Sequence, residues 1–203
     1  VMNKIKFGKK SDYGWSDWMG LRYVHEDRLG GQMEYRRDSD RGGNEVYGQE
    51  VEFNQPEMWM QGAYRFNDKM RLHLIASAQY HQRNDWYGST SYKARQGMIN
   101  TSMQFELEYD DEGSNLKTGI SYRYLDLIED IGFTYNPLNL SYGGDYRNQQ
   151  HVPGVFAENV LNFANSNATW IAGARLDWHD DFGLKFTPRT LIKYNVTEFT
   201  TVR

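Results

Sequence analysis

The feature that most constrains this chain is a two-residue alternation of apolar and polar side chains, clearest over Ala168–His179. Successive side chains of a strand point to opposite faces, so this segment has one apolar and one polar face. One face carries Ala168, Trp170, Ala172, Ala174, Leu176 and Trp178, and the other carries Thr169, Ile171, Gly173, Arg175, Asp177 and His179. A soluble sandwich packs such an apolar face on a core, whereas an outer-membrane barrel turns it toward lipid.

Composition narrows the class of protein. Only 39% of the 203 residues are hydrophobic, and no apolar run approaches the roughly 20 residues of a membrane-spanning helix, so such a helix is excluded. Aromatic residues nevertheless make up 15% of the chain, too many for a disordered segment. The net charge of -4 argues against a nucleic-acid partner, and the absence of cysteine removes disulfides and thiolate sites. A polar chain rich in aromatics suits a barrel with a wet interior.

The alternation recurs along the chain with no helical period between the repeats. The predicted strands cover residues 13–25, 57–66, 71–83, 98–109, 115–126, 152–163, 168–179 and 184–194, with a ninth beginning near 199. Most of them match the about 9–11 residues of a membrane-spanning strand and exceed the roughly 5–6 of an ordinary one. The lengths therefore favour a membrane barrel.

The connections between these strands alternate in length. Short segments rich in Asn, Asp and Gly are expected to form tight turns at 67–70, 110–114, 164–167 and 195–198. Long polar segments are expected to form loops at 26–55, 84–97 and 127–151. Tight turns on one side and long loops on the other are typical of outer-membrane barrels. The connection at 180–183 breaks the rule, because it should be long and is short.

Aromatic residues collect where the apolar faces end. Phe66, Tyr109, Phe163 and Tyr194 lie beside the short turns, and Tyr80, Tyr124 and Trp178 lie near the long loops. Two such girdles mark the two membrane interfaces of a barrel. The apolar residues between them are expected to face lipid: Leu74, Ala76, Met103, Phe105, Ile120, Ala172 and Ala174.

Three C-terminal blocks carry a resemblance to a known family. They read PGVFAE at 153–158, AGARLD at 172–177 and FTPRTLIKYN at 186–195, with EFTTVR at 198–203. In this order they resemble the barrel of TonB-dependent outer-membrane receptors. The segment YVHEDRLGG at 23–31 looks like the Bacteroidetes-type members of that family, which are similar to cobalamin and siderophore receptors.

The resemblance implies an all-β fold, an antiparallel up-and-down transmembrane β-barrel segment of about 8–9 strands within a larger 22-stranded barrel. Residues 1–203 are then part of the barrel domain, with the plug domain and the remaining strands absent. The implied function is active uptake of a scarce nutrient, a corrinoid or iron-siderophore, across the bacterial outer membrane. The implied partners are the TonB complex, reached through an absent N-terminal segment, the nutrient, outer-membrane lipid and a surface lipoprotein. The long loops would be extracellular.

Two other readings stay open. A small complete outer-membrane barrel or a soluble all-β domain would act as a surface adhesion or ligand-binding module. An enzyme is not expected, because the five histidines are scattered over separate segments and no Gly-x-Ser-x-Gly nucleophile motif is present.

Ligand capture is the use we expect for the long loops. Aromatic and arginine side chains anchor binding surfaces at modest entropic cost. The candidate ligand-binding residues are Trp86, Tyr87, Tyr92, Arg95, Tyr135, Tyr142, Tyr146 and Arg147. A calcium site is a further candidate, because hard oxygen ligands at close spacing suit Ca²⁺. Its ligands would be Asp38, Asp40, Asn44 and Glu45.

Overall fold

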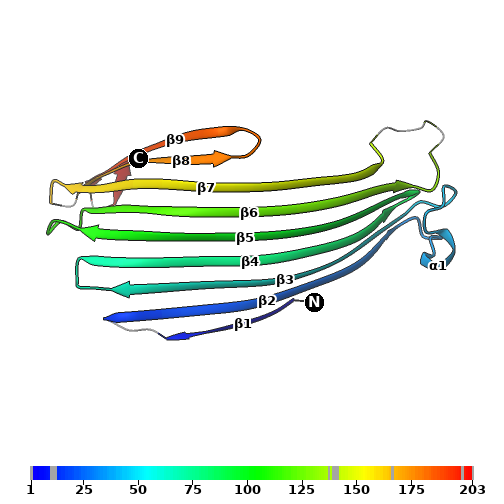
Figure 1. Cartoon of the computed structure of the whole chain (residues 1–203), viewed down its shortest axis with the longest axis horizontal. Coiled ribbons are helices and arrows are strands. Elements are labelled where there is room, and N and C mark those ends of the chain that lie inside the picture. The colour runs from blue at the N-terminus through cyan, green and yellow to red at the C-terminus, as the bar shows by residue number, and fades with distance from the viewer. Residues whose placement is uncertain are drawn as a thin grey trace.

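A computed structural model describes residues 2–9, 13–136, 138, 142–165, 167–197 and 199–202. These residues form one antiparallel sheet in which every strand pairs with the next along the chain (Figure 1). The strands are β1 (Met2–Lys9), β2 (Gly14–Gly31), β3 (Gly48–Arg65), β4 (Met70–Tyr87), β5 (Thr90–Glu108), β6 (Asn115–Phe133), β7 (Gly144–Phe163), β8 (Ala168–His179), β9 (Gly183–Thr197) and β10 (Thr200–Val202). One short helix, α1 (Arg37–Asp40), lies between β2 and β3. The predicted all-β up-and-down architecture is confirmed.

The pairing register does not shift between β1 and β9. One cross-strand row reads Leu74, Met103, Ile120, Val155 and Leu176 on β4 to β8. A one-residue slip at any pair would move these side chains to the opposite face. Among the described pairings the register shifts between β9 and β10, at Thr200 and Thr201.

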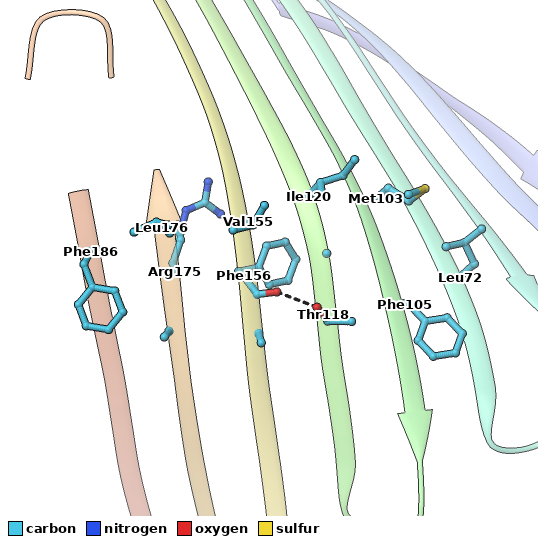
Figure 2. A pocket seen from close by; sticks show the side chains of 13 residues that line it. Leu72, Met103, Phe105, Thr118, Ile120, Val155, Phe156, Arg175, Leu176 and Phe186 are labelled. Carbon is cyan, nitrogen blue, oxygen red and sulfur yellow. Dashed lines mark hydrogen bonds between the residues drawn. The ribbon is translucent and has the colours of Figure 1, made fainter. Parts of the chain in front are cut away.

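We call the side that carries this row the apolar face and the other side the polar face. Figure 2 shows apolar side chains of neighbouring strands lying side by side on the apolar face, and they belong to β4 through β9. Together they line a shallow depression of about 570 Å³. Their exposure is high, with Ile120 at 52% and Phe186 at 66%. The residues predicted to face lipid all share this face.

Both predicted aromatic girdles lie on the apolar face. Phe66, Tyr109, Phe163 and Tyr194 lie at the short-turn end of the sheet and are all exposed. Tyr80 and Trp178 lie toward the other end, with exposures of 43% and 55%. The stretch of β4 from Leu72, beside the girdle at the short turns, to Tyr80 is nine residues long, about the length that crosses a bilayer at a tilt.

The sheet is a single layer. Within the described part of the chain no second sheet or long helix covers either face, and buried apolar side chains are few. They are Tyr35, Val51, Ala94, Val152 and Ala168. A soluble sandwich would instead bury one face of each sheet. Among the described residues no helix is long and apolar enough to cross a membrane.

The number of strands and the extent of the loops differ from the prediction. The described residues form ten strands where about eight or nine were expected, because β1 was missed in a segment that looked irregular. The expected loop at 84–97 is a hairpin whose tip is only Gly88 and Ser89. The expected loops at 26–55 and 127–151 shrink to the connections 32–47 and 134–143.

The strands continue beyond the outer girdle, the one that contains Tyr80 and Trp178, because backbone pairing does not require an apolar face. Above the girdle both sides of a strand meet water, so the alternation that identifies a membrane strand ends while the hydrogen-bond ladder continues. For example, Glu52 on β3 pairs with Asn84 on β4. Both polar residues lie on the same side of the sheet as the apolar face, but beyond the girdle that contains Tyr80.

Candidate functional site

The far end of the sheet from the short turns forms a connected rim. We define this outer rim as the connection 32–47, the hairpin tip at Gly88 and Ser89, and the connection 134–143, which gather at one end in Figure 1. The Gly88 N–H donates to the Gly48 carbonyl at 2.8 Å, and the Thr134 N–H donates to the Ser89 carbonyl at 3.0 Å. The Thr134 hydroxyl also donates to the Gly42 carbonyl. The three segments are therefore tied to one another.

The connection 32–47 is anchored on the buried side chain of Glu50, which is 4% exposed. Tyr35 donates its hydroxyl to Glu50 Oε1 at 2.7 Å, and Arg41 Nη2 lies 2.6 Å from Glu50 Oε2. Arg37 adds a contact to Glu50 at 3.3 Å and a two-pronged pair with Asp27. Burial and the hydrogen bond to Glu50 raise the pKa of Tyr35 to about 12.

A second cluster lies on the polar face just below the hairpin tip. Asp85 is fully buried and accepts hydrogen bonds from Arg83 Nε and, at 2.9 Å, from the Tyr87 hydroxyl. The Tyr92 hydroxyl donates to Glu129 at 2.5 Å, and the Arg83 guanidinium lies 5.7 Å from the centre of the Tyr92 ring. Burial and the Glu129 carboxylate raise the pKa of Tyr92 to about 12. The sequence prediction missed Arg83, Asp85 and Glu129.

The structure divides the predicted ligand-binding residues into three groups. Tyr87, Tyr92 and Tyr146 lie on the polar face. Trp86, Arg95 and Arg147 lie on the opposite side, because each is one or three residues away from a polar-face position. Tyr135 and Tyr142 lie in the connection 134–143. Only the first and third groups can contribute to one interior surface.

Individual contacts show where some of the predicted ligand-binding residues lie. Trp86 lies beneath the connection 32–47, where a Cβ built on Gly42 would come within 3.0 Å of its ring. Arg147 Nε lies 3.2 Å from Asp126 Oδ1 on the same side of the sheet. The Tyr142 carbonyl accepts the Tyr146 hydroxyl at 2.7 Å.

The structure does not bring the predicted calcium ligands together. Asp40 Oδ2 accepts the Arg36 N–H at 2.8 Å, and its Oδ1 accepts the Ser39 hydroxyl at 2.9 Å, so this carboxylate closes the turn of α1. In the parts of the chain that the structure describes, no three His, Cys, Asp or Glu side chains are placed to hold a metal ion. The set Asp38, Asp40, Asn44 and Glu45 therefore gains no support from the geometry.

The motif residues of the C-terminal blocks converge on the polar face at mid-strand. Arg175 forms two contacts of 2.7 Å with Asp177 and donates from Nη2 to the Ser121 hydroxyl at 2.6 Å. This guanidinium reaches across β7 at Gly154, where a Cβ would lie only 2.1 Å from Asp177 Oδ1. Glycine is therefore required for the cluster. Arg175 also covers the Phe156 ring at 5.9 Å, and Figure 2 shows the two side chains next to each other.

The family model described as "TonB dependent receptor-like, beta-barrel" matches residues 8–203. The chain belongs to this family. The family consists of outer-membrane β-barrels that serve as receptors, so the expected fold, outer-membrane location and receptor character are confirmed at that level. For a member of this family, the apolar face is the one that meets lipid and the polar face lines the lumen.

One solved structure to which this chain is similar is that of a mutant of the ferric enterobactin receptor from Pseudomonas aeruginosa. It is 11% identical, with a TM-score of 0.41, over 98% of this chain and 40% of that receptor. The receptor segment thus spans two fifths of the length of that protein. No curated protein matches the sequence.

Proposed function

We propose that this segment is part of the wall of an outer-membrane receptor that takes up a scarce nutrient, a corrinoid or an iron-siderophore, with energy supplied through TonB. The family match over residues 8–203 carries the proposal. The continuous apolar face and the hydrogen-bonded polar face support it, because a transport barrel needs exactly one lipid-facing and one water-facing side.

The outer rim is proposed to be extracellular and to collect the nutrient. Aromatic side chains with satisfied hydroxyls, such as Tyr87 and Tyr92, present rigid rings toward the lumen. The exposed Tyr135 and Tyr142 of the connection 134–143 stand beside them at the same end, at 53% and 51% exposure. Rigid aromatic surfaces bind ligands with little loss of conformational entropy.

The proposed partners follow from this role. The nutrient would contact the rim, outer-membrane lipid would cover the apolar face, and the TonB complex would act through a part of the receptor outside this segment. A surface lipoprotein over the outer rim is a further proposed partner. No nucleic-acid partner is proposed, because the segment is acidic overall.

The test is uptake by cells that carry or lack the full-length receptor. Radiolabelled cyanocobalamin and a siderophore loaded with radioactive iron would be offered separately, in strains with and without functional TonB. We expect one of the two to enter only when both the receptor and TonB are present. Uptake of both compounds that is unchanged by deletion of the receptor would contradict the proposal.

A second experiment addresses the rim. Replacing 134–143 by a two-residue turn should leave the receptor assembled and lower its affinity for the nutrient. The matched control shortens the turn at 110–114, at the opposite end of the sheet, which should leave affinity unchanged. Equal affinity after both changes would remove the connection 134–143 from the binding surface.

A further inference from the structure

A groove crosses the polar face at mid-strand, well below the outer rim. It has a volume of about 480 Å³ and is formed by β4 to β9. Neutral hydrogen-bonding side chains line its floor, including Ser77, Asn100, Ser102 and Ser121. We call it the lumen groove.

The charged residues of the lumen groove are mostly cationic. Arg123, Arg175 and Lys185 line it, and Asp177 is the one carboxylate among the lining residues. Asp177 is occupied by Arg175, with two contacts of 2.7 Å, so these two charges compensate each other. The charges of Arg123 and Lys185 are left to set the potential of the groove.

The hydrogen-bonding groups of the groove also favour donors. His179 Nδ1 accepts the Asp181 N–H at 3.1 Å, which leaves the proton of a neutral imidazole on Nε2. Arg175, on β8, is held by Asp177 and by Ser121, which lies two residues before Arg123 on β6. Guanidinium, ammonium and hydroxyl donors around one depression match the oxygens of a carboxylate or phosphate group.

We propose that the lumen groove binds the carboxylate or phosphate oxygens of an anionic nutrient as it passes along the wall. This rests on the proposed function and narrows it, since an anionic metal chelate fits the groove better than a corrinoid without net negative charge. Arg123 and Lys185 supply the attraction, and the Arg175–Asp177 pair holds the surface in shape.

The test uses a cysteine in the groove of the full-length receptor. The segment has no cysteine, so Ser102→Cys introduces a single reporter here once any cysteine outside the segment is replaced. The positive charges of Arg123 and Lys185, taken at about 8 Å from the thiol, should attract an anionic methanethiosulfonate reagent. That reagent should react about fivefold faster than a neutral methanethiosulfonate, and a cationic methanethiosulfonate should react about fivefold slower than the neutral reagent. The control is Gln61→Cys, on the same cross-strand row but on β3, two strands from Ser102.

Binding itself is tested with citrate as the probe. Citrate near its dissociation constant should slow the modification of Ser102→Cys by the neutral reagent about twofold, and glycerol at equal concentration should not. Arg123→Gln with Lys185→Gln should abolish both the charge preference and the protection, while Gln61→Cys should show neither.

Three results would overturn the proposal: no charge preference at Ser102→Cys, no protection by citrate, or a cysteine that no reagent reaches. These readouts are independent of nutrient uptake. Failure in the groove with normal TonB-dependent uptake would reject the lumen groove alone. Uptake that is unchanged by deletion of the receptor, together with intact citrate protection, would reject the proposed transport function alone.

Discussion

Arginine at Ala174 should block assembly of the barrel wall, because this position faces the membrane near its middle. Ala174 is exposed on the apolar face and lines the depression shown in Figure 2. It stands six residues beyond Ala168, the first residue of β8. Six steps of about 3.3 Å give roughly 20 Å along the strand, or about 15 Å of height at a tilt near 40°.

That height lies near the middle of an apolar band about 25 Å tall, where arginine costs about 2–4 kcal/mol. Ala174→Arg should therefore make folding into a bilayer less favourable by that amount, which lowers the folding equilibrium constant by a factor of roughly 30–700. The assay is urea-dependent folding of the full-length receptor into vesicles, followed by the heat-modifiable gel band.

Two controls separate charge from size and from position. Ala174→Leu enlarges the same side chain without a charge and should be tolerated. Ala63→Arg makes the same substitution on the polar face of β3, where water is available, and should cost far less. Equal losses for Ala174→Arg and Ala63→Arg would refute the assignment of the two faces.

Three further predictions concern the polar face and the rim. Gly154→Val should destabilise the receptor by about 1–3 kcal/mol in a thermal melt, because its Cβ would lie 2.1 Å from Asp177 Oδ1, whereas Gly97→Val, with nothing within 4 Å, should be nearly neutral. Glu50→Gln should speed tryptic cleavage at Arg36, Arg37 and Arg41, because it weakens the buried anchor of the connection 32–47. The control Glu52→Gln changes an exposed residue of the same strand and should not speed cleavage. Equal cleavage of the two variants would argue against the anchor. The pKa of Tyr92 is raised to about 12, so the folded state favours its protonated form. Its stabilising contribution is therefore complete below pH 10 and is lost as the pH rises through 12. In an absorbance titration at alkaline pH, Tyr92→Phe should remove one late-ionising tyrosine, and an unchanged titration would contradict the buried contact with Glu129.

Alternation predicted the strands in the membrane part of the fold. Over Ala168–His179 the apolar residues recur at every second position, and the structure pairs that segment in register with both neighbours. The strand extensions above the girdle carry no such signal, because residues such as Glu52 and Asn84 meet water on either face. Their pairing depends on the strands below, which a local pattern does not record.

The candidate ligand-binding residues do not all share one face of the sheet, because they were grouped by segment and not by face. Trp86 and Tyr87 are adjacent in a strand and must point to opposite sides, so the parity rule alone could have separated them once 84–97 was read as strand. Arg83, Asp85 and Glu129 needed the register between β4, β5 and β6, which one sequence does not supply. The calcium prediction did not include the hydrogen bonds that the Arg36 N–H and the Ser39 hydroxyl donate to Asp40.

The most direct test of the account is a cysteine scan along β5 from Met98 to Leu107 in the full-length receptor in membranes. Each position would be treated with a water-soluble thiol reagent and, in parallel, labelled with a fluorophore quenched by a brominated lipid. The account predicts strict alternation, with quenching by lipid at Ile99, Thr101, Met103, Phe105 and Leu107 and reaction from water at Asn100, Ser102 and Gln104. Reaction from water at both sets, with no quenching by lipid at either, would contradict it.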